Sequence, residues 1–120
     1  MNYSGSCHCG RIAFEIDREL GGDLTGVVAC NCSICRRKGA LMWFVPRAAL
    51  KLATPASDTA SYSFNKHVIK HRFCPHCGIH PFGEGTRPDG VQSAAINVRC
   101  LDDVDIESLD RKSTRLNSSH

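Results

Sequence analysis

The chain has 120 residues, of which 42% are hydrophobic and 22% charged, the composition of one folded domain and not of a disordered segment. Its formal charge is +3, but three of its fifteen basic residues lie in the last ten positions, where there is no acidic residue. The other twelve basic residues balance twelve acidic residues, so the body of the chain has no electrostatic reason to bind nucleic acid.

No apolar run approaches the roughly 20 residues that cross a bilayer, so we expect no membrane contact. The first residues lack the basic and apolar regions of a secretory signal. Eight cysteines in a chain without such a signal favour free thiols, and therefore a cytoplasmic protein.

Alternation of apolar and polar residues with a period of two is the main local signal, as at 11–17, and it is typical of half-buried strands. Pro46 ends an apolar segment at 41–45 and begins a helical turn at 46–50, while the glycines and proline of 83–90 predict a loop. We expect strands at 11–17, 24–29, 41–45, 50–53, 61–64, 68–73 and 92–98. Many short strands with one or two helical turns predict a mainly β domain of short antiparallel strands.

The last ten residues do not extend this pattern. They are polar, with a single apolar residue, and look like sequence added after the true coding region was cut. We therefore expect the domain to occupy residues 1–110 and the segment 111–120 to be an unstructured, non-native tail. An ordinary frayed terminus is the alternative.

Seven of the eight cysteines lie in tight clusters, and two separated pairs could close a four-sulfur shell around one zinc ion. These pairs are formed by Cys7, Cys9, Cys74 and Cys77. Such a site would staple a small β domain, because its binding energy becomes folding energy. Gly10 and Gly78 each follow the second cysteine of a pair, where the backbone often needs a positive φ.

The remaining cluster supplies three thiolates within six residues, from Cys30, Cys32 and Cys35. Three protein ligands leave one position open, which is typical of a catalytic zinc site. Arg36 and Arg37, with Lys38 after them, either form a solvated surface or hold the carboxylates of an anionic substrate. A fourth ligand would close the site, and the candidates are His67, His71, His76 and His80.

Other uses of the cysteines are less favoured. A disulfide within a Cys-x-Cys segment is strained, and Gly78 and Pro81 are poor starts for the helix that a redox Cys-x-x-Cys requires. We expect Cys100 to be a buried apolar filler and not a ligand of the open site.

Segments 5–10, 30–39, 73–78 and 97–102 resemble the glutathione-dependent formaldehyde-activating enzyme family, which includes the domain of centromere protein V. The resemblance implies a β-tent zinc-binding fold. It also implies that Cys7, Cys9, Cys74 and Cys77 hold a structural zinc, and that Cys30, Cys32 and Cys35 hold a catalytic zinc. Family chains usually continue into a further aromatic-Asp-Gly segment, so we expect this chain to be truncated at its C-terminal end.

The leading hypothesis is a zinc-dependent carbon–sulfur lyase that acts on thiol–aldehyde adducts such as S-hydroxymethylglutathione. It requires two zinc ions per chain and glutathione as a co-substrate, with Arg36 and Arg37 positioning the anionic thiol. The sequence identifies no general base. The alternative is a non-catalytic, zinc-stabilised β module that binds a protein partner.

Overall fold

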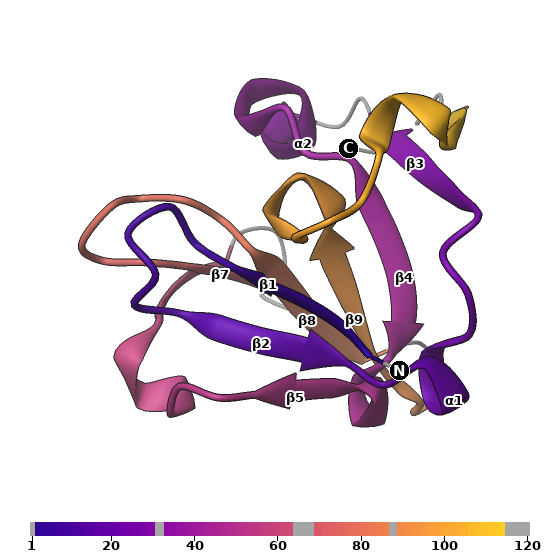
Figure 1. Cartoon of the computed structure of the whole chain (residues 1–120). Coiled ribbons are helices and arrows are strands. Elements are labelled where there is room, and N and C mark those ends of the chain that lie inside the picture. Colours follow the sequence, from indigo (N-terminus) through magenta and orange to yellow (C-terminus); the bar gives the residue numbers. More distant parts are fainter. Residues whose placement is uncertain (1, 31–32, 64–68, 87–88, 115–120) are drawn as a thin grey trace.

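The computed structural model describes residues 2–30, 33–63, 69–86 and 89–114. Two β-sheets dominate it, and the helices are short (Figure 1). The mainly β fold class expected from the sequence is therefore confirmed. None of the described helices is long and apolar enough to cross a membrane.

The smaller sheet has three antiparallel strands in the order β1-β2-β5. They span Tyr3–Ser6, Ala13–Ile16 and Leu50–Leu52. β1 also meets the last part of the chain, because Asp102 N–H donates to the Ser4 carbonyl at 2.8 Å. A side chain at Gly5 would come within 2.5 Å of the Cys100 carbonyl, so only glycine permits this close approach.

The larger sheet has seven strands in the order β10-β3-β4-β9-β8-β7-β6. Its neighbouring strands are antiparallel except for the parallel pair β10 and β3. In chain order the strands are β3 (Gly26–Cys30), β4 (Met42–Pro46), β6 (Ala60–Tyr62), β7 (Ile69–Phe73), β8 (Phe82–Thr86), β9 (Gln92–Asn97) and β10 (Asp110–Thr114).

Short helical segments connect the strands. They are α1 (Arg18–Gly21), α2 (Ser33–Lys38) and the 3₁₀ turns η1 (Arg47–Ala49), η2 (Ala56–Asp58), η4 (Val98–Cys100) and η5 (Ile106–Ser108). Asp17 caps α1 by accepting a hydrogen bond from Glu19 N–H at 2.9 Å. The helical turn expected at 46–50 is η1, directly after the end of β4.

Two expectations about strands are wrong. Segment 83–90 was expected to be a loop, but Phe82–Thr86 forms β8, held between β7 and β9. Its two glycines lower its intrinsic strand preference, and pairing on both sides outweighs that preference. Residues 111–114, expected to belong to an unstructured tail, form most of β10 beside β3; residues 115–120 lie outside the described part.

The core lies between the two sheets and reaches the cysteine pairs. Phe14 from the smaller sheet meets Phe82 from the larger one, with ring centroids 6.1 Å apart, and each is 1% exposed. Burying one such ring contributes about 1.5–3 kcal/mol. Cys7 and Cys74 belong to the same cluster of buried residues, so the core holds half of the predicted four-sulfur site in place.

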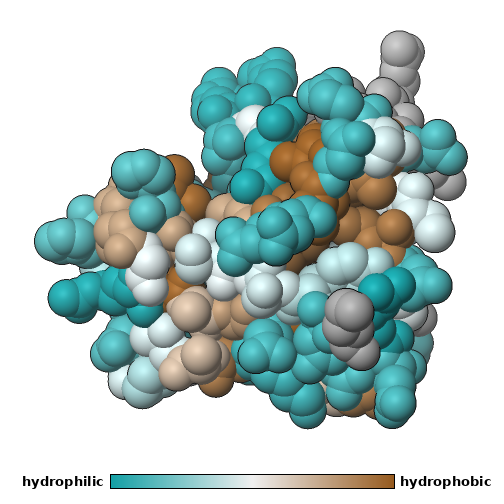
Figure 2. All heavy atoms as spheres, viewed as in Figure 1, coloured by the Kyte–Doolittle hydropathy of each residue, from teal (hydrophilic) through white to brown (hydrophobic). Residues whose placement is uncertain are grey.

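Hydrophilic residues cover most of the molecular face that carries β1 and β2 (Figure 2). Apolar surface is visible there in several separate patches, one of them near the η4 and η5 turns. This distribution is ordinary for a folded domain, much of whose surface is apolar.

Candidate metal centre

Two tight turns carry the paired cysteines. Cys7 and Cys9 follow β1, whereas Cys74 and Cys77 lie between β7 and β8. In each turn the N–H of the first cysteine donates to the carbonyl five residues later: Cys7 to Ile12 and Cys74 to Ile79, both at 2.9 Å. Each turn therefore curls its chain around the sulfur of its first cysteine.

A glycine closes each turn. Gly10 and Gly78 have φ of 84° and 82°, which confirms the positive φ expected at both positions. Their N–H groups donate back to the carbonyls of Cys7 and Cys74, at 3.2 and 2.8 Å.

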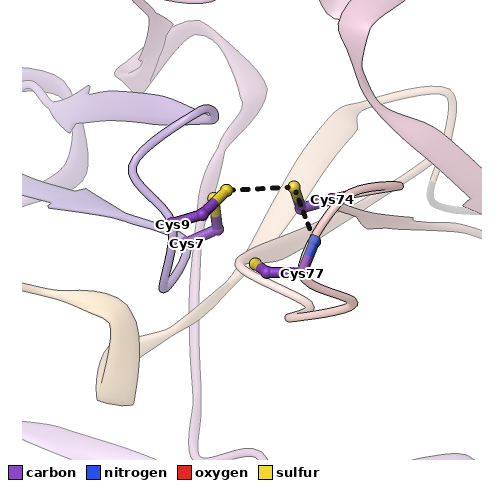
Figure 3. Close-up of side chains that lie close together, drawn as sticks. All are labelled: Cys7, Cys9, Cys74 and Cys77. Carbon is purple, nitrogen blue, oxygen red and sulfur yellow. Dashed lines mark hydrogen bonds between the residues drawn. The ribbon is translucent and has the colours of Figure 1, made fainter.

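The four sulfurs of Cys7, Cys9, Cys74 and Cys77 converge from these two turns (Figure 3). All four Sγ atoms lie within 4.8 Å of one another, and the Cys7–Cys9 and Cys9–Cys74 pairs are each 3.6 Å apart. Sulfurs at about 2.3 Å from a tetrahedral zinc ion would be about 3.8 Å apart. The four thiols therefore fit a tetrahedral metal ion such as zinc, and they are free cysteines.

Main-chain N–H groups point at the buried sulfurs. Cys7 Sγ accepts from Ile12 at 3.3 Å, and Cys74 Sγ accepts from His76 at 3.3 Å and Cys77 at 3.4 Å. Such donors stabilise a thiolate over a thiol. For Cys74, burial raises the pKa, but the Cys77 and His76 N–H groups outweigh it, and the net pKa is lowered.

The second cysteines of the two pairs differ in acidity. The N–H groups of Ile79 and Cys9 lower the pKa of Cys77 to about 6. The Arg11 N–H lowers the pKa of Cys9, but burial and the thiols of Cys7, Cys74 and Cys77 outweigh it and raise the pKa to about 11. Without a metal, this cluster therefore holds both a thiolate and a thiol near neutral pH.

The three-cysteine segment lies at the end of β3. Cys30 is the last residue of β3, and Cys35 lies in α2. Cys32 lies outside the described residues, as do the side chains of Cys30 and Cys35, so the three-thiolate site stays a prediction. Arg36 and Arg37 are exposed on α2, in its last turn, where cations also complement the helix carbonyls.

Two histidines lie within electrostatic reach of the end of α2. His71, 8% exposed in β7, has its pKa lowered to about 4 by burial, with smaller contributions from Lys38 and His80. Burial and Lys38 also lower the pKa of His80. Both histidines are candidate fourth ligands of the three-cysteine site, and that role stays a prediction.

The surroundings of His80 show how the structure holds it. Its ring stacks on Phe73 with centroids 5.1 Å apart, and its carbonyl accepts from Asn97 Nδ2 at 3.1 Å. Its Nδ1 is buried and has no hydrogen-bond partner in the described part of the chain. Of the other two candidates, His76 is exposed and His67 lies outside the described residues.

Cys100 packs against the core, half-buried in η4. Burial, followed by the charges of Cys7 and Cys77, raises its pKa to about 11. A neutral thiol packed on apolar residues agrees with the expected filler role.

The chain resembles known proteins over nearly all of its length. The family model named "Glutathione-dependent formaldehyde-activating enzyme" matches residues 2–115. A protein of Colletotrichum graminicola, provisionally named a glutathione-dependent formaldehyde-activating enzyme, is 29% identical over 118 residues. That match covers 92% of this chain but only 56% of the relative, so the chain spans about half the length of that protein.

A crystal structure of a Rhodobacter sphaeroides protein has a similar fold, with a TM-score of 0.75 and 28% sequence identity. The match covers 91% of this chain and 99% of the solved one. With the family match over residues 2–115 and four converging cysteines, this chain belongs to the glutathione-dependent formaldehyde-activating enzyme family.

Proposed function

We propose that this chain catalyses glutathione-dependent activation of formaldehyde, as a zinc-dependent carbon–sulfur lyase. In the forward direction the thiol sulfur of glutathione bonds to the carbonyl carbon. The C=O double bond becomes single, and the thiol proton ends on the oxygen, giving S-hydroxymethylglutathione. The lyase direction breaks the same carbon–sulfur bond. The observation that carries this proposal is the family match over residues 2–115.

In this proposal the four-sulfur cluster has a structural role. Cys7, Cys9, Cys74 and Cys77 would hold one zinc ion between the turn after β1 and the turn after β7. Since two of the four sulfurs lie in the core, this ion would contribute to folding and not to turnover.

Cys30, Cys32 and Cys35 would hold the catalytic zinc. Zinc held by three thiolates supplies a Lewis acid and a position for the substrate thiol. Arg36 and Arg37, exposed on α2 beside this segment, would bind the carboxylates of glutathione by charge-assisted hydrogen bonds. The imidazoles of His71 and His80 have lowered pKa values and so stay neutral at pH 7. These two imidazoles would therefore add no positive charge to that of the α2 cations.

The alternative of a non-catalytic module that binds a protein partner is not favoured, because the matching family model is named for an enzyme. We propose that the chain acts in the cytoplasm on a small-molecule thiol and aldehyde, which agrees with its many free thiols. The balanced charge of the chain agrees with a function that involves neither nucleic acid nor membrane.

The test measures two quantities. Exchange NMR gives the rate at which glutathione and formaldehyde interconvert with their adduct, and a metal assay gives the zinc content per chain. Cys32→Ser should slow the catalysed exchange by at least about 100-fold and lower the zinc content from about two ions per chain to about one. The fold should remain intact. Cys100→Ser, which leaves both predicted sites complete, is the matched control. A Cys32→Ser variant with the full rate would sink the proposal, and unchanged zinc content would remove Cys32 from the ligand set.

A further inference from the structure

A cavity of about 260 Å³ opens along the larger sheet, and none of the described residues that line it is a cysteine. Its lining includes three cationic residues, one acidic residue and two neutral hydrogen-bonding residues: Arg47, Lys70, Arg72, Glu84, Thr86 and Gln92. None of these residues belongs to a predicted zinc site, and the proposed function gives none of them a role.

Strand register places this cavity at the opposite end of the sheet from the three-cysteine segment. Met42, the first residue of β4, pairs with Val28, two residues before Cys30. The far end of β4 pairs Pro46 with Ser93, and Arg47 follows. Four residues of strand span about 13 Å, so one small substrate would not occupy both places.

The charged residues occupy the same face of the sheet as the core. Phe82, Glu84 and Thr86 alternate onto one face of β8, and Phe82 is 1% exposed. Glu84 pairs with Lys70 on one side and Ala94 on the other. The buried face therefore changes from apolar to charged within two residues.

Glu84 fixes the two arginines in place. Its carboxylate accepts from Arg47 Nε at 2.5 Å and from Arg72 Nε at 2.8 Å, and all three side chains are less than 30% exposed. Arg47 Nη1 also donates to the Leu50 carbonyl at 2.9 Å, and Arg72 Nη1 to Thr59 Oγ1 at 3.4 Å. Each guanidinium carries donors on three nitrogens, so each keeps one nitrogen beyond these bonds.

The charges do not balance. Burial raises the pKa of Glu84, but its bonds to Arg47 and Arg72 outweigh that effect and hold the pKa below its usual value. Ionised Glu84 neutralises one of three positive charges, which leaves a local charge of about +2.

Lys70 indicates that the charged residues around the cavity do more than hold the fold together. A clasp that only tied β7, β8 and η1 together would need Arg47, Arg72 and Glu84. Lys70 is exposed, and neither an ion pair nor a hydrogen bond joins its side chain to another residue within the described ranges. Its ammonium is thus an available donor at the mouth of a cavity that already holds two oriented guanidiniums.

We propose that this cavity binds a small anion through a phosphate group. The local charge matches a dianion, and two guanidiniums with one ammonium supply charge-assisted donors to several phosphate oxygens. The volume lies just below the range of about 300–1,000 Å³ that holds drug-sized ligands, so it admits a phosphate with a few further atoms.

The test titrates the folded, zinc-loaded protein with inorganic phosphate at about pH 8, where phosphate is dianionic, and at constant ionic strength. Two-dimensional ¹H–¹⁵N NMR should show saturable shifts at the amides of Gly85, Thr86 and Gln92. Lys70→Gln should weaken binding about tenfold or more, since it removes one charge-assisted contact. Lys51→Gln, an exposed lysine of the smaller sheet, is the matched control and should leave binding unchanged.

Four results would overturn the proposal. Shifts that grow linearly with phosphate, or equal weakening in both lysine variants, would mean non-specific screening. Shifts confined to the cysteine turns would place phosphate at the metal instead. Succinate binding as tightly as phosphate would replace the phosphate site with a general carboxylate site. Because none of these readouts uses the formaldehyde reaction, the result stands apart from the proposed function.

Discussion

The two cysteine turns have almost the same backbone but differ in how they treat their sulfurs. Both have a first cysteine buried in the core, Cys7 at 2% and Cys74 at 0% exposure, and both close on a glycine with positive φ. The turns differ in spacing, because the second has one more residue between its cysteines. Cys74 Sγ accepts from two main-chain N–H groups, whereas Cys7 Sγ accepts from one.

The second cysteines of the two turns also differ in acidity when no metal is bound. The second turn holds Cys77 with a pKa of about 6, and the first holds Cys9 with a pKa of about 11. One turn is therefore prepared to present thiolates to a metal, and the other keeps a proton until a metal displaces it. Two turns with similar backbones can therefore hold their second cysteines in different protonation states within one four-sulfur site.

Removing a sulfur from each turn gives the largest expected effect. Cys9→Ser and Cys74→Ser should each weaken zinc binding by more than about 100-fold, because each removes one of four ligands. Cys74→Ser should also lower stability in the metal-free protein, because it places a hydroxyl in the buried core.

Competition with a chromophoric chelator measures the affinities, and urea unfolding in the absence of zinc measures the stabilities. Cys100→Ser serves as the control for general loss of a thiol, since Cys100 lies outside the cluster. If Cys9→Ser bound zinc as tightly as the unmodified chain, Cys9 would not be a ligand. The two turns would then not supply two ligands each.

The pH dependence of zinc binding gives the next largest effect. Between about pH 7 and pH 9, Cys77 has already lost its proton and Cys9 still holds one, so binding releases the Cys9 proton. Affinity should therefore rise with pH, by about tenfold per unit for each proton released. As pH falls through about 6, Cys77 gains a proton as well, and the dependence should steepen.

The two second-cysteine variants separate these contributions. Cys9→Ser should lower the slope of log affinity against pH by about one between pH 7 and pH 9, whereas Cys77→Ser should leave the slope in that range unchanged. Equal slopes in the two variants would show that the protons are shared evenly across the cluster and that the turns do not differ.

Much of the fold and the four-sulfur cluster could be predicted from the sequence. Period-two alternation predicted β2, which buries one face, and an apolar run that ends at Pro46 predicted β4. Cysteine spacing with trailing glycines predicted both turns, because the residues that wrap a sulfur are local in sequence.

The failures come from contacts that are distant in sequence. β8 carries glycines at positions 83 and 85, and it is a strand because β7 and β9 pair with it on both sides. β10 pairs with β3 across about 80 residues of chain, and its polar sequence gives no sign of that parallel pairing. The cavity around Glu84 was missed for the same reason, since Arg47, Arg72 and Glu84 meet only in the folded sheet.

The glycines give the smallest effect and the finest test of the two turns. Gly10→Ala and Gly78→Ala would each place a Cβ in open space, so only the positive φ opposes them. That strain costs about 1–2 kcal/mol. Alanine also lowers the conformational entropy of the unfolded chain, which offsets part of the cost, so each variant should lose about 1 kcal/mol of unfolding free energy. Gly90→Ala is the matched control. Gly90 has a φ of 90°, a Cβ there would also meet open space, and the residue is distant in sequence from the cysteine turns. It should cost a similar amount of stability in urea unfolding while leaving zinc affinity unchanged. Because Gly10 and Gly78 hold their turns through similar hydrogen bonds, a much larger loss at one of them would show that this turn alone supports the fold.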